Sequence, residues 1–207
     1  MSDAAGRRQI RAVYTDQTIT VYQAFRDAIA DAALTAGTFV SPFSHSRATW
    51  IKPSFLWMAY RCGWAAKEGQ ERVLAVEISR EGFDWALEHA CLSDYDRAVY
   101  PDAVQWRRRM KTTCVRVQWD PERDLHLQPL DHRAIQVGLT GEAVARYTND
   151  WIVSIAEETA RMKQVRTLLA AGDEGGARAI LPVEMPYPVH PELAALIGAT
   201  GNRPCSD

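Results

Sequence analysis

The sequence predicts a single-domain α+β fold, with mixed or mainly antiparallel sheets and flanking helices. The chain has 207 residues, of which 47% are hydrophobic and 24% charged, enough for one well-buried core and rather short for two. Segments with the period of strands and segments with the period of helices follow one another without a strict βαβα order. We therefore expect one α+β domain over residues 1–180, followed by a proline-rich C-terminal extension over residues 181–207.

Strands are expected where β-branched and apolar residues alternate with other residues or form short runs. These segments are residues 9–14, 49–51, 73–78, 112–119, 133–139 and 151–155. Within 112–119, Val115, Val117 and Trp119 point to one face of the strand. Arg116 and Gln118 point to the other, so this strand is predicted to have one buried and one polar face.

Helices are expected over residues 21–36, 55–61, 81–89 and 157–171, with a shorter one near residues 143–147. Thr20 is a suitable N-cap for the first helix, and Gly37 is suited to end it. Val21, Phe25 and Ile29 recur at helical spacing in this segment and are predicted to face the core. Residues 94–111 are expected to be irregular.

The most distinctive stretch is residues 47–64, RATWIKPSFLWMAYRCGW, which combines aromatic and cationic side chains. A buried helix avoids this mixture, because unpaired buried charge is costly. On the helix expected over 55–61, Trp57 and Arg61 share one face. We therefore expect this stretch to line a site. The alternative is an amphipathic element whose Lys52 and Arg61 extend to water.

The formal net charge is -2, so any contact with nucleic acid has to come from a local basic patch. One such patch is formed by Arg107, Arg108 and Arg109 beside Trp106. Guanidinium groups pair with phosphate oxygens, and aromatic rings stack on bases. The three arginines are therefore candidates for nucleic-acid binding, with a solvated helix end as the alternative.

Cysteine spacing and the lack of targeting segments suggest a reduced, cytoplasmic protein. The four cysteines form no C-x-x-C pair and are Cys62, Cys91, Cys114 and Cys205. The first residues contain no apolar signal region, and no window approaches the roughly 18 apolar residues that a membrane span requires. His126 and His132 are the histidines closest to forming a ligand pair, and we predict no metal site.

The motifs G-x-S-x-G, G-x-x-x-x-G-K-[ST], H-E-x-x-H and G-x-G-x-x-G do not occur in the sequence. The candidate site therefore consists of polar residues on predicted strands and around the 47–64 stretch, with aromatic neighbours. They are Arg11, Thr49, Lys52, Arg61 and Gln136, with Tyr14, Tyr22 and Trp57. Gln136 stands between Ala134 and Gly138, which are expected to leave room for a ligand. Cationic side chains with few candidate bases suit a phosphorylated ligand such as a dinucleotide.

Several runs resemble an uncharacterised bacterial and fungal family defined by a domain of unknown function. These runs are RQIRAVY, ITVYQAF, PFSHSRATWIKPSFLWMAYRCGW, GQERVLAVEISREGF, VRVQWDPERD, RAIQVGL and WIVSI, and they span most of residues 8–160. Ala48 and Cys62 stand where that family has a methionine and a serine. The resemblance gives the chain a family but no activity.

A second resemblance is to the ADP-ribosyltransferases, which implies an ADP-ribosyltransferase-like fold with NAD as substrate. IRAVY supplies Arg11, RATWIKPSF supplies Thr49 and AIQVGL supplies Gln136, in the order found in those enzymes. The resemblance implies that Arg11 holds the dinucleotide, that Thr49 lines the nicotinamide side and that Gln136 bonds a ribose hydroxyl. Gln136 replaces the more usual glutamate and lacks the negative charge that would stabilise an oxocarbenium-like centre.

We therefore expect a transferase that binds NAD and passes ADP-ribose to a nucleic-acid or protein acceptor. Tyr14, Tyr22, Lys52, Trp57 and Arg61 would complete the binding site for NAD. The alternative is a non-enzymatic module that binds a nucleotide or nucleic acid through the same residues. Such a module would show steep salt dependence of binding and no turnover.

Overall fold

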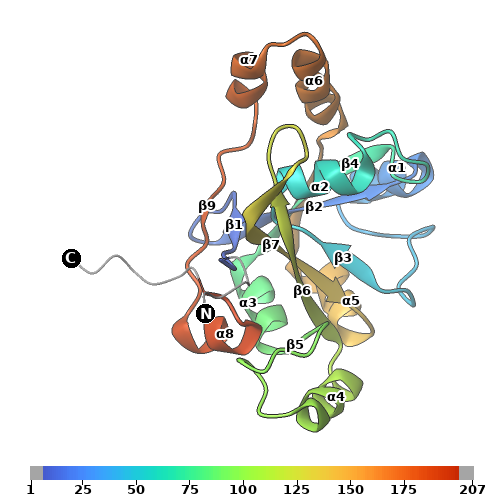
Figure 1. Cartoon of the computed structure of the whole chain (residues 1–207). Coiled ribbons are helices and arrows are strands. Elements are labelled where there is room, and N and C mark those ends of the chain that lie inside the picture. Colours follow the sequence, from blue (N-terminus) through green and yellow to red (C-terminus); the bar gives the residue numbers. More distant parts are fainter. Residues whose placement is uncertain (1–6, 201–207) are drawn as a thin grey trace.

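The computed structural model, which describes residues 7–200, confirms the α+β fold class (Figure 1). Its strands are β1 (Arg11–Ala12), β2 (Thr18–Phe25), β3 (Thr49–Ile51), β4 (Arg72–Ser79), β5 (Ala90–Leu92), β6 (Val115–Arg123), β7 (Pro129–Leu139), β8 (Ile152–Glu157) and β9 (Met185–Pro186). Its helices are α1 (Asp27–Ala36), α2 (Phe55–Cys62), α3 (Arg80–Glu88), α4 (Ala103–Thr112), α5 (Glu142–Arg146), the π-helical turn η1 (Tyr147–Trp151), α6 (Thr159–Ala170), α7 (Glu174–Ala179) and α8 (Pro191–Ile197).

Two sheets form the centre of the molecule, in the orders β2-β4-β8 and β3-β7-β6-β5, and β1 pairs with β9 in a small third sheet. The pairs between these strands are antiparallel, except that β5 and β6 are parallel. Val115, Val117 and Trp119 are buried on β6, as their alternation predicts. The opposite face of β6 remains available for polar side chains.

The prediction of a helix over residues 21–36 is wrong for residues 21–25, because Thr18–Phe25 forms strand β2. β2 pairs with β4 along its whole length, from Thr18 opposite Ser79 to Phe25 opposite Arg72. The run TITVYQAF is rich in β-branched and aromatic residues, which favour a strand when a neighbouring strand such as β4 is available to pair with it. Helix α1 begins only at Asp27 and ends at Gly37, whose φ of 70° is the left-handed conformation expected there.

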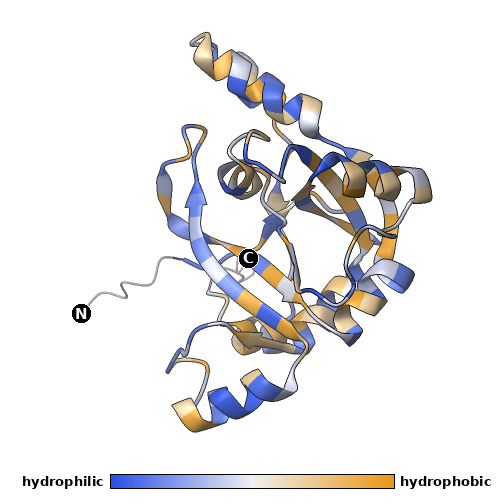
Figure 2. Ribbon diagram, turned by 90° about the vertical axis from the view of Figure 1, so that its right-hand side faces the viewer, coloured by the Kyte–Doolittle hydropathy of each residue, from blue (hydrophilic) through white to orange (hydrophobic). Residues whose placement is uncertain are grey.

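Helix α4 corrects the expectation that residues 94–111 are irregular. Its N-cap is Asp102, whose carboxylate accepts hydrogen bonds from the amides of Val104 and Gln105 at 2.7 and 2.8 Å. The helix has no buried residue, and much of it is coloured as hydrophilic at the bottom of Figure 2. The indole of Trp106 attaches it to the sheet by donating to the Leu92 carbonyl at 2.9 Å. Capping and such side-chain bonds to neighbouring carbonyls compensate for the weak apolar periodicity of the segment.

The segment after residue 181 contributes buried side chains to the core as far as the structure describes it, contrary to the expectation of a proline-rich extension. Tyr187 and Ile197 are fully buried. Pro186 lies in β9 opposite Arg11, and Pro191 occupies the first turn of α8, both places where a missing N–H is tolerated. The prolines therefore shape this segment without excluding it from the core.

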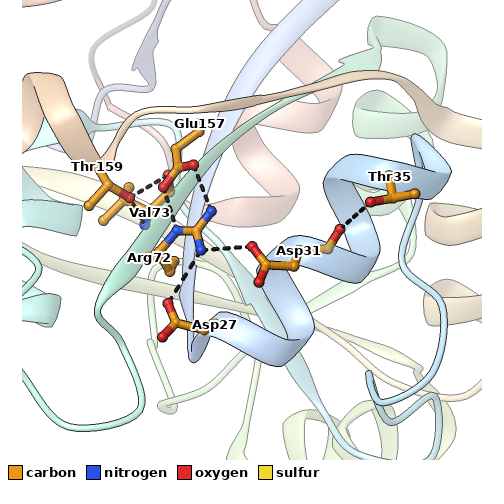
Figure 3. Close-up of polar contacts among 7 residues, drawn as sticks. All are labelled: Asp27, Asp31, Thr35, Arg72, Val73, Glu157 and Thr159. Atoms are coloured by element: carbon orange, nitrogen blue, oxygen red, sulfur yellow. Dashed lines mark hydrogen bonds and ion pairs between the residues drawn. The ribbon is translucent and has the colours of Figure 1, made fainter.

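Arg72 joins α1 to β4 and β8 on the surface of the β2-β4-β8 sheet (Figure 3). Its guanidinium lies 2.5 and 2.7 Å from the two carboxylate oxygens of Glu157. It also lies 2.8 Å from Asp31 and 3.3 Å from Asp27, both on α1. The hydrogen bonds from Arg72 hold the pKa of Glu157 below its ordinary value.

We expect Arg72→Met to lower the free energy of unfolding at pH 7 by about 1 kcal/mol, because the pair with Glu157 is bidentate but partly screened by solvent. A carboxyl with a depressed folded-state pKa stabilises the fold above its ordinary pKa and ceases to do so as pH falls through the folded value. The difference between the two proteins should therefore shrink at acidic pH. Urea denaturation at several pH values measures it.

The matched control is Arg166→Met, because Arg166 is an exposed arginine on α6. This variant should stay within about 0.5 kcal/mol of the wild type at every pH. Equal losses in the two variants would contradict a specific role for the Arg72 cluster.

Candidate functional site

A cavity of about 770 Å³ opens where β2 and β3 separate. The two strands meet at one backbone pair, in which the Tyr22 amide donates to the Lys52 carbonyl at 2.7 Å. Beyond this pair, residues 23–25 and 47–50 line the cavity instead of pairing with each other. Side chains from α2, β6 and β7 complete the lining. The cavity is thus built from segments that are distant in sequence.

The structure brings five of the predicted site residues to this cavity. They are Thr49, Lys52, Trp57, Arg61 and Gln136. Thr49 comes from β3, Trp57 and Arg61 from α2, and Gln136 from β7, with Lys52 at the junction of β3 and α2. Ser54 positions α2 by accepting from the Trp57 amide at 3.1 Å as the N-cap.

A carboxylate stands beside Gln136. Gln136 pairs directly with Gln118 across β7 and β6. The amide groups of both glutamines donate to Asp120, at 2.9 Å from Gln118 and 2.6 Å from Gln136. The strand was expected to end at Trp119, but β6 continues to Arg123, so the alternation that exposes Gln118 also exposes Asp120 to the cavity. That alternation could have identified Asp120 from the sequence.

Gln23 fixes the hydroxyl of Thr49. The fully buried Tyr147 donates its O–H to Gln23 at 2.7 Å. The Gln23 amide in turn donates to Thr49 Oγ1 at 2.6 Å and to the Trp50 carbonyl at 3.3 Å. Because Thr49 Oγ1 accepts this bond, its own O–H is left to donate to a ligand. Gln23 was not among the predicted site residues, because residues 21–36 were expected to form a helix.

Lys52 is only 7% exposed, although it lines the cavity. Its ammonium or amine nitrogen donates to the Trp50 carbonyl at 3.1 Å. Burial lowers the pKa of Lys52 to about 7, and the nearby charge of Arg61 acts in the same direction, whereas Asp120 opposes the shift. A substantial fraction of this side chain is therefore neutral at physiological pH.

The cavity also carries a stacked group of aromatic and cationic side chains. The rings of Trp57 and Tyr60 stack at 5.2 Å between centroids. The Arg123 guanidinium lies 3.7 Å from the centre of the Tyr60 ring and 5.3 Å from that of Trp57. Arg47, Lys52, Arg61 and Arg123 line the cavity together with one carboxylate, that of Asp120. This excess of cations suits an anionic ligand.

Gly138 does not leave room for a ligand, because the Trp50 ring occupies the space beside it. A Cβ atom at residue 138 would lie 2.9 Å from three carbons of that ring. Trp50 pairs with Gly138 across β3 and β7 and itself lines the cavity. The glycine therefore serves the packing of Trp50 and not ligand access.

Arg11 lies outside the cavity. Its guanidinium donates to the Glu184 carbonyl oxygen at 2.9 Å, since β1 pairs with β9 and not with the central sheets. Close by, the Glu184 carboxylate accepts from the Phe55 amide at 2.7 Å, at the start of α2. Burial raises the pKa of Glu184 to about 8, and the charge of Glu122 adds to this rise. Arg11 thus belongs to a polar cluster that supports α2.

Tyr14 and Tyr22 also lie outside the cavity. The Tyr14 hydroxyl donates to the Pro186 carbonyl at 3.1 Å. Tyr22 is buried and packs edge-on against Phe55, with 5.5 Å between ring centroids. Both tyrosines therefore position neighbouring elements.

The arginines of α4 do not line the cavity. Arg109 donates to the carbonyls of Ala90 and Glu88 at 2.8 and 3.1 Å, which fixes the helix to its neighbours. Arg107 and Arg108 are exposed. Any contact that these two make with nucleic acid would occur away from the cavity.

Cys62, Cys91 and Cys114 are free thiols, and Cys205 lies outside the described residues. Within residues 7–200, no group of three or more His, Cys, Asp and Glu side chains is placed to hold a metal ion. In the same part of the chain, no helix has both the length and the apolar composition needed to cross a membrane.

Comparison with known proteins places the chain in a family. No curated protein matches the sequence. Residues 9–187 match the family described as Domain of unknown function (DUF4291), in agreement with the resemblance to such a family seen in the sequence. Because this match spans most of the chain, the protein belongs to the DUF4291 family.

Proposed function

We propose that the cavity binds NAD and that the protein transfers ADP-ribose from it to a nucleic-acid or protein acceptor. The observation that carries the proposal is the Asp120 carboxylate, hydrogen-bonded to Gln136 at 2.6 Å in a cavity whose other charged residue types are arginine and lysine. Asp120 supplies the negative charge that Gln136 lacks. A carboxylate fixed in this way favours the positive charge that develops on a ribose as its glycosidic bond breaks.

In this proposal some cavity residues bind the diphosphate and a planar ring of NAD, and others bind its nicotinamide and the reacting ribose. Arg61 and Arg123 pair with the diphosphate, and the Trp57–Tyr60 stack receives a planar ring. Thr49 donates its hydroxyl hydrogen to the nicotinamide carboxamide. Gln136 keeps its carbonyl oxygen free for a ribose hydroxyl, since its NH₂ group is bonded to Asp120.

The reaction breaks the bond between the ribose C1′ and the nicotinamide nitrogen, and the pair of electrons leaves with neutral nicotinamide. The acceptor nucleophile forms the new bond to C1′ and loses its proton. The diphosphate contacts implied for Arg11 by the resemblance are assigned here to the cavity arginines instead, because Arg11 lies on β1 outside the cavity.

Asp120→Asn is expected to retain NAD binding and to lose transfer by about 100-fold or more, the effect of removing one group that stabilises transition-state charge. Calorimetry with NAD measures binding, and release of nicotinamide with labelled NAD measures turnover in the presence of RNA, DNA or cell extract. Arg166→Ala, on the exposed face of α6, serves as the control and should change neither quantity. Absence of NAD binding to the wild-type protein would refute the proposal.

The second candidate is a non-enzymatic module that binds a nucleotide or nucleic acid. Its support is a second cavity of about 430 Å³, which shares Gln118 with the first. The lining contains the carboxylates of Asp94 and Asp96, of which Asp96 pairs with Arg8 at 2.7 Å, and the cationic side chains of Arg97 and Arg133 beside Tyr95. A polynucleotide could follow both cavities with its phosphates on these arginines. This candidate predicts that affinity falls steeply with salt and that Asp120→Asn leaves binding nearly unchanged. Any release of nicotinamide would exclude it.

A further inference from the structure

Lys52 differs from every other lysine of the chain. The four lysines are Lys52, Lys67, Lys111 and Lys163. Lys52 is 7% exposed and lines the main cavity, whereas the other three are exposed. Burying a lysine ammonium costs free energy, so a buried lysine in a cavity suggests a functional role for its amine.

The surroundings of Lys52 favour the neutral amine. Among residues 7–200, its nitrogen has one hydrogen-bond acceptor within reach, the Trp50 carbonyl at 3.1 Å. An ammonium group carries three donors, so the charged form would leave donors unsatisfied in a buried place. The charged or titratable groups that act on Lys52 are Arg61 and Cys62 from α2 and Asp120 from β6. Arg61 disfavours a second positive charge there.

We infer that Lys52 is an amine nucleophile that condenses with the aldehyde or ketone group of an anionic ligand bound in the cavity. The inference goes beyond the proposed transfer of ADP-ribose and does not depend on NAD as the ligand. It rests on a buried amine in a cavity of about 770 Å³ whose other charged residues are Arg47, Arg61, Arg123 and Asp120. The arginines would bind a phosphate or carboxylate on the same molecule that carries the carbonyl group.

The condensation needs no oxidant and no cofactor. The lone pair of the Lys52 nitrogen forms a bond to the carbonyl carbon, and the carbonyl oxygen takes up a proton. That proton is one of the two amine hydrogens, and the second follows it to the oxygen. The C–O bond then breaks, the oxygen leaves as water and the nitrogen lone pair completes the C=N bond, so that one amine and one carbonyl give one imine and one water. Asp120 lines the same cavity and its charge acts on Lys52, so in this inference it is the carboxylate that accepts and returns the proton.

The test uses pyridoxal 5′-phosphate, an aldehyde that carries a phosphate, on the full-length wild-type protein. Borohydride reduces any imine to a stable amine, and peptide mapping by mass spectrometry gives the extent of modification at each of the four lysines. At pH 7 about half of an amine with a pKa near 7 is neutral, against about 1 in 10³ for an ordinary lysine. We therefore expect Lys52 to react at least about 10-fold faster than Lys67, Lys111 or Lys163, after allowance for its restricted access.

Two comparisons sharpen the result. Pyridoxal without its phosphate should modify Lys52 at least several-fold more slowly, and its reaction with the exposed lysines should be unchanged. Lys52→Arg should abolish the fast site, whereas Lys67→Arg should leave it intact. Because the mapping is done on the wild-type protein, the test does not depend on the folding of either variant.

Modification of Lys52 at or below the rate of the exposed lysines would overturn the inference. So would equal rates with pyridoxal and its phosphate. NAD binding is measured separately by calorimetry, so the two proposals can fail independently. Fast trapping at Lys52 without NAD binding would refute the transferase and support the amine nucleophile. NAD binding with an unreactive Lys52 would support the transferase proposal and refute the amine nucleophile.

Discussion

Gly82→Ala is expected to lower the free energy of unfolding by about 2 kcal/mol, as an overpacked core residue. Gly82 is buried in α3, and a Cβ atom there would lie 2.4 Å from Cγ of the Trp151 ring. Non-bonded carbons prefer roughly 3.5 to 4.0 Å, so the ring or the helix has to move by about 1 Å. Trp151 is held in turn by Trp85, at 5.5 Å between ring centroids. The melting temperature should fall by roughly 4 to 8 °C.

The opposing effect is helix propensity, since alanine is better than glycine by about 1 kcal/mol in a helix interior. Gly175→Ala isolates that effect, because Gly175 lies in α7 and a Cβ atom there would meet nothing closer than 3.7 Å. We expect Gly175→Ala to stabilise the protein slightly in the same thermal denaturation experiment. A neutral or stabilising Gly82→Ala would show that Trp151 is free to move.

Gln23→Leu is expected to cost about 2 to 4 kcal/mol of stability, because it leaves buried polar groups without partners. The Tyr147 hydroxyl loses its acceptor, and Thr49 loses the donor that fixes its orientation. Tyr147 is fully buried, so water cannot easily replace the lost bond. Chemical denaturation measures the loss, and calorimetry with NAD should show weaker binding, since Thr49 lines the cavity.

The double variant Gln23→Leu/Tyr147→Phe separates the two contributions to this loss. Replacing both partners of a buried hydrogen bond by apolar groups is far less costly than removing one. We expect the double variant to be more stable than Gln23→Leu alone by about 1 kcal/mol or more. Ligand binding should remain weak in both, because Thr49 stays unoriented. Simple additivity of the two single variants would argue against a coupled network.

The candidate site could be predicted where its residues lie in regular segments read correctly from the sequence. Thr49, Trp57 and Arg61 belong to the strand and helix expected from residues 47–64, and both elements form. Gln136 lies on the strand expected over residues 133–139 and lines the cavity. Gln23 and Asp120 were missed because a strand was read as a helix in one case and was ended too early in the other. In both cases the partner strand, β4 for β2 and β7 for β6, decides the conformation of the segment.

The position of Arg11 could not be predicted from the sequence. Its order in the chain fits the resemblance to ADP-ribosyltransferases, but order does not define which sheet a short strand joins. β1 consists of two residues and pairs with β9, nearly 175 positions later, so Arg11 faces the Glu184 carbonyl. The segment after residue 181 supplies this partner strand. Its many prolines led to the expectation of an extension and not of a paired strand.

By itself the sequence determined the α+β class, most helices and strands, and the family to which the chain belongs, because periodicity, caps and specific runs are local properties. Only the tertiary structure decided that residues 18–25 form strand β2. The spacing of apolar residues there fits both a helix and a strand, and pairing with the backbone of β4 favours the strand. The tertiary structure also decided which polar residues share a cavity. Convergence of Thr49, Asp120 and Gln136 depends on strand register and on the separation of β2 from β3, and both are set by contacts between residues far apart in the chain.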